Sequence, residues 1–281
     1  MPVRIVTDSA ADLLNDEVAR LGVEVVPLSI RFGTDEFTDG VDLSVAEFYE
    51  KLASSDALPE TSAPSPGAFE AAFRRQAEAG ADAVVCINLS EGLSATIQAA
   101  RNAATAVAGD LDLDVRVVDS RSITSGLGTQ VTVAAEAAAD GASPDEVVAL
   151  VESLARRTHV LGALDTLDNL KKGGRIGGAQ ALLGSLLSIK PLLDISSGEV
   201  AEAGRARTRR KALEWLRDQV FAVPEVEHLC VAHGGATDLD DMLALLAPRY
   251  PADAIQVRTI GATIGTHGGP RVMGVTWVDP A

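Results

Sequence analysis

The sequence predicts a two-domain α/β protein, and three observations lead to that prediction. The chain has 281 residues, more than a usual single domain. In its first half, strand patterns alternate with helix patterns, which is typical of a mostly parallel sheet with helices on both faces. Past about residue 158 the pattern changes, and a hairpin there favours a mixed or antiparallel sheet. We therefore expect an N-terminal α/β domain over residues 1–158 and a C-terminal α/β domain over residues 159–281.

The first elements begin at the N-terminus. Residues 3–7 (VRIVT) form an apolar run that predicts a buried strand. Ser9 and Asp12 have the spacing of a capping box and predict the start of a helix. Residues 23–32 (VEVVPLSIRF) predict the next strand, and residues 33–40 predict a hairpin.

Serines mark the following helix starts. Ser44 with Glu47, and Ser143 with Glu146, have capping-box spacing, and Ser65 precedes a proline suited to the first helical position. Further strands are predicted at residues 81–89 and 114–120, and further helices at residues 92–109 and 129–141.

The second half predicts a different order of elements. Glycines end a short helix within residues 160–178, and Thr237 with Asp240 predicts another capping box. Residues 264–270 (IGTHGGP) hold one of only four histidines and predict a sharp turn. The remaining elements are helices at 179–189 and 207–220, a hairpin of strands at 190–195 and 199–206, and strands at 227–234, 253–261 and 270–279.

Composition excludes several classes of protein. The net charge of −16 argues against general binding to nucleic acids or anionic membranes, since both need a cationic surface. The two cysteines, Cys86 and Cys230, lie in apolar runs, and neither a zinc motif nor a disulfide framework is present. We find no signal peptide and no apolar run long enough to span a membrane, and we expect a cytoplasmic protein.

Polar residues gather at two predicted junctions between a strand and a helix. Ligands of open α/β sheets bind at such junctions, where helix N-termini point. Ser90 and Ser94 flank a glycine at one of them and could bind an anion, although Ser94 could equally only cap its helix. Thr61, in a loop stiffened by prolines, and His267 are further candidates, and each is also compatible with an ordinary surface turn.

Motifs of self-sufficient enzymes are missing. GLSAT lacks the last glycine of a nucleophile elbow, and neither a dinucleotide fingerprint nor a phosphate-binding loop occurs.

A basic segment stands out instead. Residues 171–217 contain ten Lys or Arg and four acids, a local charge of +6 on an acidic chain. Such a segment is either a solvated surface or a docking patch for an acidic or phosphate-bearing partner.

Seven motifs occur in the order typical of the DegV family, and the chain resembles that family over essentially its whole length. They are VTDSAAD, ETSAPSPGAF, LSEGLSATIQAA, VVDS, LDNLKKGGRIG, IKPLLDISSGEV and IGTHGGP. The resemblance implies a two-domain DegV-like fold with a Rossmann-like N-terminal sheet. It also implies a lipid-binding subunit of a bacterial fatty acid kinase, used in phospholipid metabolism.

The resemblance implies specific roles for residues. A long-chain fatty acid, the only ligand and not a cofactor, would lie between the domains, with its carboxylate at Thr61, Ser94 and His267. A separate kinase subunit would phosphorylate that carboxylate with ATP. The turn with Arg175, Lys171 and Lys172 would contact the kinase, with Arg175 exposed and away from the lipid. No metal, no nucleic acid and only transient membrane contact for lipid exchange are expected.

Two departures and two alternatives qualify this interpretation. Ala95 replaces a glycine typical of the family, and the residues after His267 differ from its Pro-Gly pair, which leaves chain-length preference open. One alternative is a hydrolase or acyltransferase that uses Ser94 with His267. The other is a regulatory module without a ligand.

Overall fold

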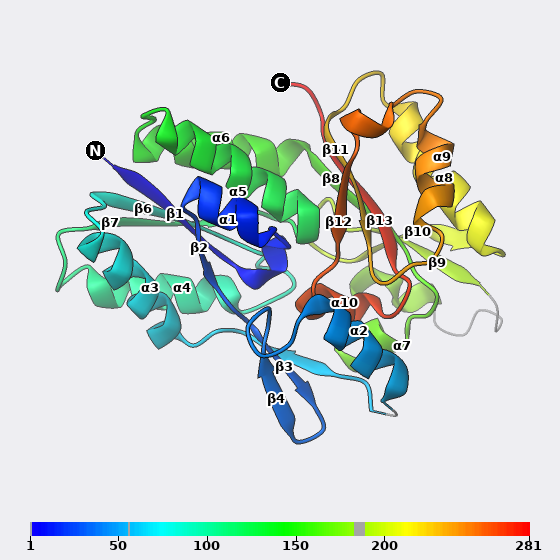
Figure 1. The fold of residues 1–281 in the computed structure, drawn as a ribbon, viewed down its shortest axis with the longest axis horizontal. Helices are drawn as coiled ribbons and strands as arrows, with labels where there is room; N and C mark the ends of the chain where they lie inside the picture. The colour runs from blue at the N-terminus through cyan, green and yellow to red at the C-terminus, as the bar shows by residue number, and fades with distance from the viewer. Residues whose placement is uncertain (1, 56, 183–188) are drawn as a thin grey trace.

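The computed structural model describes residues 2–55, 57–182 and 189–281. A parallel sheet of four strands occupies one half of the molecule (Figure 1). Its strand order is β2 (Glu24–Val26), β1 (Val3–Asp8), β6 (Ala83–Asn88) and β7 (Asp114–Asp119). All three pairings are parallel, as the alternation of strand and helix signals predicts.

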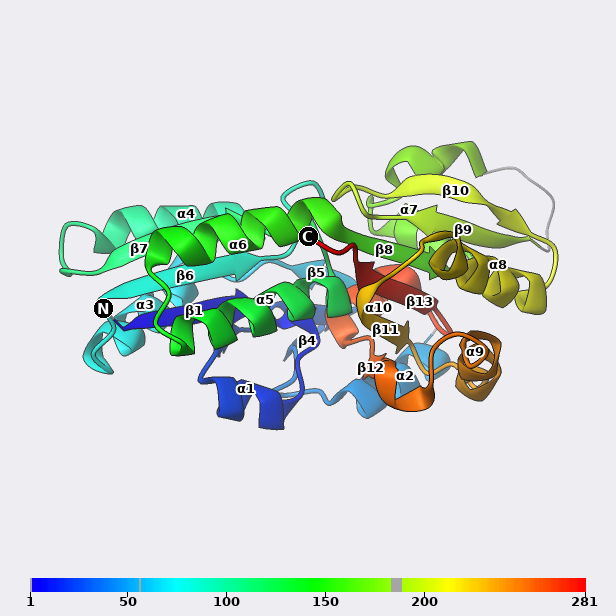
Figure 2. The ribbon, with the colours of Figure 1, turned by 90° about the horizontal axis from the view of Figure 1, so that it is seen from above.

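Helices cover both faces of this sheet (Figure 2). Val3 and Ile5 of β1 pack with the apolar side of α5 (Thr124–Ala139) and α6 (Pro144–Arg157). Val6 points to the opposite face, toward α3 (Pro66–Glu78) and α4 (Thr96–Val107). The strands are apolar on both sides because both sides are covered. α1 (Asn15–Leu21) connects β1 to β2.

A mixed sheet of six strands occupies the other half (Figures 1 and 2). Only β11 and β12 pair in parallel, and the other pairings are antiparallel. One face packs against α8 (Arg209–Ala222) and α9 (Leu239–Leu246). The strand order is β10 (Ala201–Ala206), β9 (Lys190–Asp194), β8 (Thr158–Ala163), β13 (Met273–Val278), β11 (Glu227–His233) and β12 (Gln256–Thr259).

The opposite face of the mixed sheet packs toward the N-terminal half. Val160 and Leu193 belong to an apolar cluster there, and Leu93 and Ile123 from the parallel-sheet half pack against it. The candidate site described below lies at this junction. α7 (Asp168–Lys172) and α10 (Ala262–Gly268) also lie at it.

A small antiparallel sheet borders the same junction. It consists of β4 (Asp35–Thr38), β3 (Ser29–Phe32) and β5 (Glu60–Ser62), with α2 (Val45–Ser54) packed on it. Ile30 and Phe48 form its core together with Ala262 of α10. This sheet therefore holds the start of α10 from the N-terminal half of the chain. The short 3-10 helices are η1 (Ser9–Ala11), η2 (Gly177–Leu182) and η3 (Ala252–Ala254).

The predicted serine caps are confirmed. Ser44, Ser65 and Ser143 each accept a hydrogen bond from a backbone N–H in the first turn of the helix that follows. Ser44 and Ser143 form complete capping boxes, as their spacing predicts.

Four local predictions are wrong. Ser9 does not cap a long helix, because Asp8 caps a single 3-10 turn there and α1 begins only at residue 15. Residues 23–32 form two strands in different sheets, separated at Pro27, which has no N–H for a ladder. Asp238 precedes α9 without the side-chain cap that was predicted at Thr237.

The fourth wrong prediction is the turn at residues 264–270. Most of that stretch is helical, because it continues α10 as far as Gly268. The apolar helix predicted at residues 179–189 begins in the 3-10 turn η2, and its greater part lies outside the described residues.

Candidate functional site

A largely apolar cavity lies where the two halves meet. Its volume is about 870 Å³, which includes space that is open to solvent. Leu89, Val160, Leu164 and Leu193 are typical of its wall, so both halves of the chain contribute to it. Its lining suits an apolar ligand.

Polar side chains from distant parts of the sequence converge on this cavity. Thr61 from β5, Ser94 just before α4, and His267 from α10 all line it. The structure therefore brings together the three residues that the family resemblance implies.

Thr61 and His267 contact each other directly. Thr61 Oγ1 lies 2.9 Å from His267 Nε2, a hydrogen bond between residues 206 positions apart. β5 holds Thr61 in place, since Thr61 pairs with Ile30 in the small sheet. The last turn of α10 holds His267.

The His267 imidazole is neutral at physiological pH. Burial, and to a smaller extent the positive charge of Arg175, lower its pKa to about 4. Nδ1 is buried and has no hydrogen-bond partner among the described residues. A neutral imidazole offers one N–H donor and one acceptor, so it can bind a carboxylate without forming a permanent ion pair.

Gly173 makes room for the imidazole. A Cβ atom on Gly173 would lie 2.3 Å from His267 Nδ1, which no real contact allows. The glycine pair in the KKGGR segment therefore has a packing function at this site.

Ser94 lies at the start of α4, one residue before its N-cap. Its Oγ accepts a hydrogen bond from the Thr96 N–H at 3.2 Å and lies 2.8 Å from Thr96 Oγ1. Among the described residues, no hydrogen bond joins Ser94 to His267, and no carboxylate contacts the His267 ring. The geometry thus gives no support to the serine and histidine pair of a hydrolase.

Arg175 also lines the cavity, which differs from the sequence prediction of an exposed residue away from the ligand. Its side chain is partly buried, and it donates hydrogen bonds to the backbone oxygens of Leu93 at 3.2 Å and Gly173 at 2.6 Å. These bonds hold the guanidinium beside Ser94 and His267. Lys171 and Lys172, in contrast, are exposed, as predicted for a surface segment.

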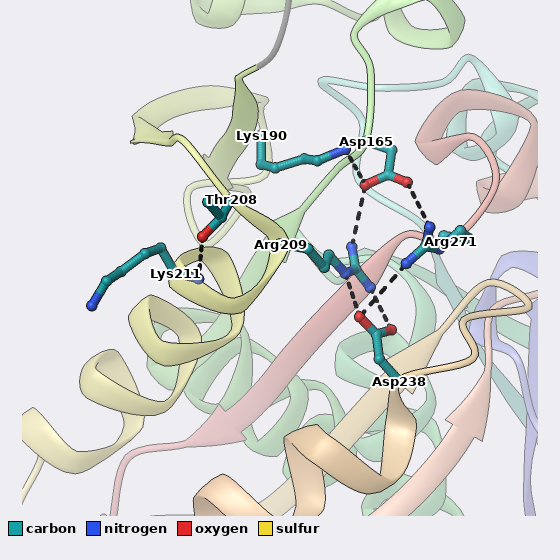
Figure 3. A network of polar contacts seen from close by, with 7 residues as sticks. All are labelled: Asp165, Lys190, Thr208, Arg209, Lys211, Asp238 and Arg271. Atoms are coloured by element: carbon teal, nitrogen blue, oxygen red, sulfur yellow. Dashed lines mark hydrogen bonds and ion pairs between the residues drawn. The ribbon is translucent and has the colours of Figure 1, made fainter.

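Part of the basic segment is neutralised within the protein (Figure 3). Arg209 binds both oxygens of Asp238 at 2.7 and 3.0 Å, and Lys190 Nζ lies 2.8 Å from Asp165. Arg271 approaches both carboxylates at 3.7 and 3.8 Å. The +6 segment therefore does not present all of its charge to solvent, and the available patch is smaller than the sequence suggests.

Three carboxyl groups of the N-terminal half have raised pKa values, and two of them, Asp12 and Asp39, lie beside the start of α10. Burial raises the pKa of Asp8 to about 6 and that of Asp12 to about 8, and it also raises the pKa of Asp39. The negative charge of Asp39 also raises the pKa of both Asp8 and Asp12. Sequence analysis indicated neither Asp8 nor Asp39 as a site residue, because nothing in their local patterns indicates convergence.

Neither a metal site nor a membrane-spanning helix is found in the part of the chain that the structure describes. No group of three or more His, Cys, Asp or Glu residues there is arranged to hold a metal ion. No helix there is both long and apolar enough to cross a bilayer.

The model of the DegV family, a family of uncharacterised proteins, matches residues 2–279. The chain belongs to the DegV family. A DegV domain-containing protein of Deinococcus radiodurans is 39% identical over 281 residues, covering 98% of each chain. Another, of Streptomyces coelicolor, is 38% identical over 279 residues, covering 97% of each.

Solved DegV structures share this fold. A fatty-acid-binding DegV family protein of Thermus thermophilus is similar with a TM-score of 0.90 and 36% identity, over 100% of both chains. DegV of Bacillus subtilis, described as a fatty acid binding protein, has a TM-score of 0.87 and 28% identity over 100% of both chains. A stearic acid-binding protein of Eubacterium ventriosum has a TM-score of 0.87 and 25% identity, over 98% of both chains.

Proposed function

We propose that this DegV protein binds a long-chain fatty acid in the cavity between its two halves. The observation that carries the proposal is the Thr61–His267 hydrogen bond at the wall of an otherwise apolar cavity. The acyl chain would pack against the apolar side chains of the cavity wall. The solved DegV relatives that bind fatty acids support this proposal.

We further propose that Thr61, Ser94 and His267 bind the carboxylate. A buried carboxylate is costly unless hydrogen-bond donors surround it. Two hydroxyl groups and one neutral imidazole supply such donors. Arg175 adds a positive charge nearby while its Nε and Nη1 groups donate to backbone oxygens, so we propose that it compensates charge without a bidentate pair through those two groups.

The biological role that we propose is presentation of the fatty acid to a kinase. A separate ATP-dependent kinase subunit would phosphorylate the carboxylate to an acyl phosphate in the cytoplasm, and this chain would supply no catalysis of its own. Lys171 and Lys172 are exposed and lie in the sequence between Leu170 and Arg175, which both line the cavity, so we propose them as the first docking contacts. Arg175 would lie between the carboxylate site in the cavity and the docking contacts at Lys171 and Lys172. Residues 1–158 and 159–281 would be the two domains that enclose the ligand.

Mass spectrometry under native conditions tests the binding proposal. We expect the purified protein to carry a noncovalent adduct with the mass of a long-chain fatty acid, and the delipidated protein to bind added fatty acid. A covalent acyl adduct on Ser94 would favour the hydrolase or acyltransferase instead. A protein that neither carries nor binds fatty acid would favour the regulatory module.

Reconstitution tests the kinase step separately. We expect acyl phosphate only when this protein, a fatty acid, ATP and a fatty acid kinase subunit are all present. Acyl phosphate without the kinase subunit would contradict the carrier role while leaving lipid binding intact.

A further inference from the structure

The short helix that holds His267 is anchored from the N-terminal half of the chain. Thr263, in the first turn of α10, donates a hydrogen bond from Oγ1 to Asp39 Oδ2 at 2.5 Å. The first turn of α10 is therefore bound by the side chain of Asp39, which comes from the N-terminal half of the chain.

Asp39 is itself fixed in place. It is 6% exposed, and Ser9 Oγ donates to its Oδ2 at 2.9 Å. Ser9 Oγ in turn accepts the Leu28 N–H at 3.1 Å, which ties the group to the chain beside the small sheet. No Lys or Arg pairs with Asp39 among the described residues, and its hydrogen-bond donors there are the hydroxyl groups of Ser9 and Thr263.

Asp12 supports the same end of α10. A Cβ on Gly261 would lie 2.5 Å from Asp12 Oδ1, so the Asp12 carboxyl packs directly against the residue that precedes α10.

The other end of α10 is anchored as well. Asn169 Nδ2 donates to Thr266 O at 2.9 Å, next to His267 in the sequence. His267 follows Thr263 by four residues, so both lie on one face of the helix, and both line the cavity. A shift of the first turn would therefore move the imidazole relative to Thr61.

We propose that Asp39 is a positioning residue for the carboxylate site, which acts through α10 by fixing His267 against Thr61. This inference rests on the proposed fatty-acid-binding function. Asp39 does not line the cavity, so any effect on the ligand passes through the helix.

A double-mutant cycle tests this inference with a fluorescent long-chain fatty acid and its methyl ester as probes. We expect Asp39→Asn to weaken binding of the acid about tenfold and binding of the ester less than about twofold, since the ester lacks the carboxylate. In a His267→Ala background, Asp39→Asn is expected to have almost no further effect on the acid. Asp238→Asn is the control, because it removes a carboxylate charge that pairs with Arg209 and has no hydrogen bond to α10 among the described residues, and it is expected to leave the acid-to-ester ratio unchanged.

Several results would overturn the inference. Equal weakening of acid and ester by Asp39→Asn would indicate general structural damage. An undiminished effect in the His267→Ala background would show that Asp39 does not act through the imidazole. If Asp39→Asn fails to fold, the same cycle is run with Ser9→Ala, which removes one donor to Asp39 and is expected to shift the ratio in the same direction by a smaller factor.

The cycle also separates this inference from the proposed function. A wild type that binds the acid and loses it on His267→Ala, with Asp39→Asn and Ser9→Ala both unchanged, would refute only the positioning role. A delipidated wild type that binds neither probe would refute both.

Discussion

Replacement of Gly173 by alanine should weaken fatty-acid binding because it displaces the His267 ring, although it removes no polar group from the protein. The backbone at Gly173 has φ −69° and ψ −8°, which alanine adopts without strain. The new Cβ would lie 2.3 Å from His267 Nδ1 and 2.7 Å from Cε1. The ring must therefore retreat by about 1 Å to reach an ordinary contact distance.

The size of the effect follows from the hydrogen bonds that this retreat breaks. The Thr61–His267 contact is 2.9 Å long, and a shift of about 1 Å along it removes the bond. A hydrogen bond to a charged group contributes about 1.5–3 kcal/mol. Loss of one such bond to the bound carboxylate should lower the affinity about 10- to 150-fold.

Fluorescent fatty-acid titration of delipidated protein measures the change, with thermal unfolding recorded for the same samples. Gly109→Ala is the matched control, because nothing lies within 4 Å of its added Cβ, and its affinity should equal that of the wild type. An unchanged affinity for Gly173→Ala would show that the imidazole does not hold the carboxylate. A weakened affinity for the methyl ester as well would show that the substitution blocks the cavity in general.

Three further predictions concern the site, pH and docking. Thr61→Val and Ser94→Ala should each weaken acid binding about 10-fold or more in the same titration, with little change in melting temperature; unchanged affinity in both would refute the carboxylate assignment. The raised pKa of Asp12, about 8, means that the folded protein binds more protons than the unfolded chain from about pH 4 to 8, so the unfolding free energy falls progressively across that range and the contribution of Asp12 is fully lost above about pH 8. Asp12→Asn should therefore reduce the fall in the unfolding free energy between pH 5 and pH 8, measured by urea titration, and an unaltered pH profile would contradict the raised pKa. Lys171→Glu with Lys172→Glu should impair phosphorylation of bound fatty acid, more so at low salt, while lipid affinity stays near wild type; loss of lipid binding with normal kinase coupling would refute docking at this segment.

The sequence by itself determined the elements whose physics is local. Ser44, Ser65 and Ser143 start helices because each side chain bonds to a backbone N–H within three residues. The alternation of apolar strands with helices determined the parallel sheet, since such strands can only be buried between helix layers. The motifs of the DegV family further implied which residues line the site, although the residues alone left Thr61, Ser94 and His267 open between ligand binding and ordinary turns.

Only the tertiary structure decided how those residues meet. Residues 264–270 predict a turn from their glycines, yet most of them are helical, because Asp39 and Asn169 hold both ends of α10 from far along the chain. The sequence predicts that Arg175 is a surface cation. In the structure, hydrogen bonds to the backbone oxygens of Leu93 and Gly173 hold it at the cavity. Contacts between residues that are 82 to 224 positions apart leave no periodicity in the sequence, since each depends on how whole elements pack. The local rules therefore specify the elements, and packing between the two halves specifies the site.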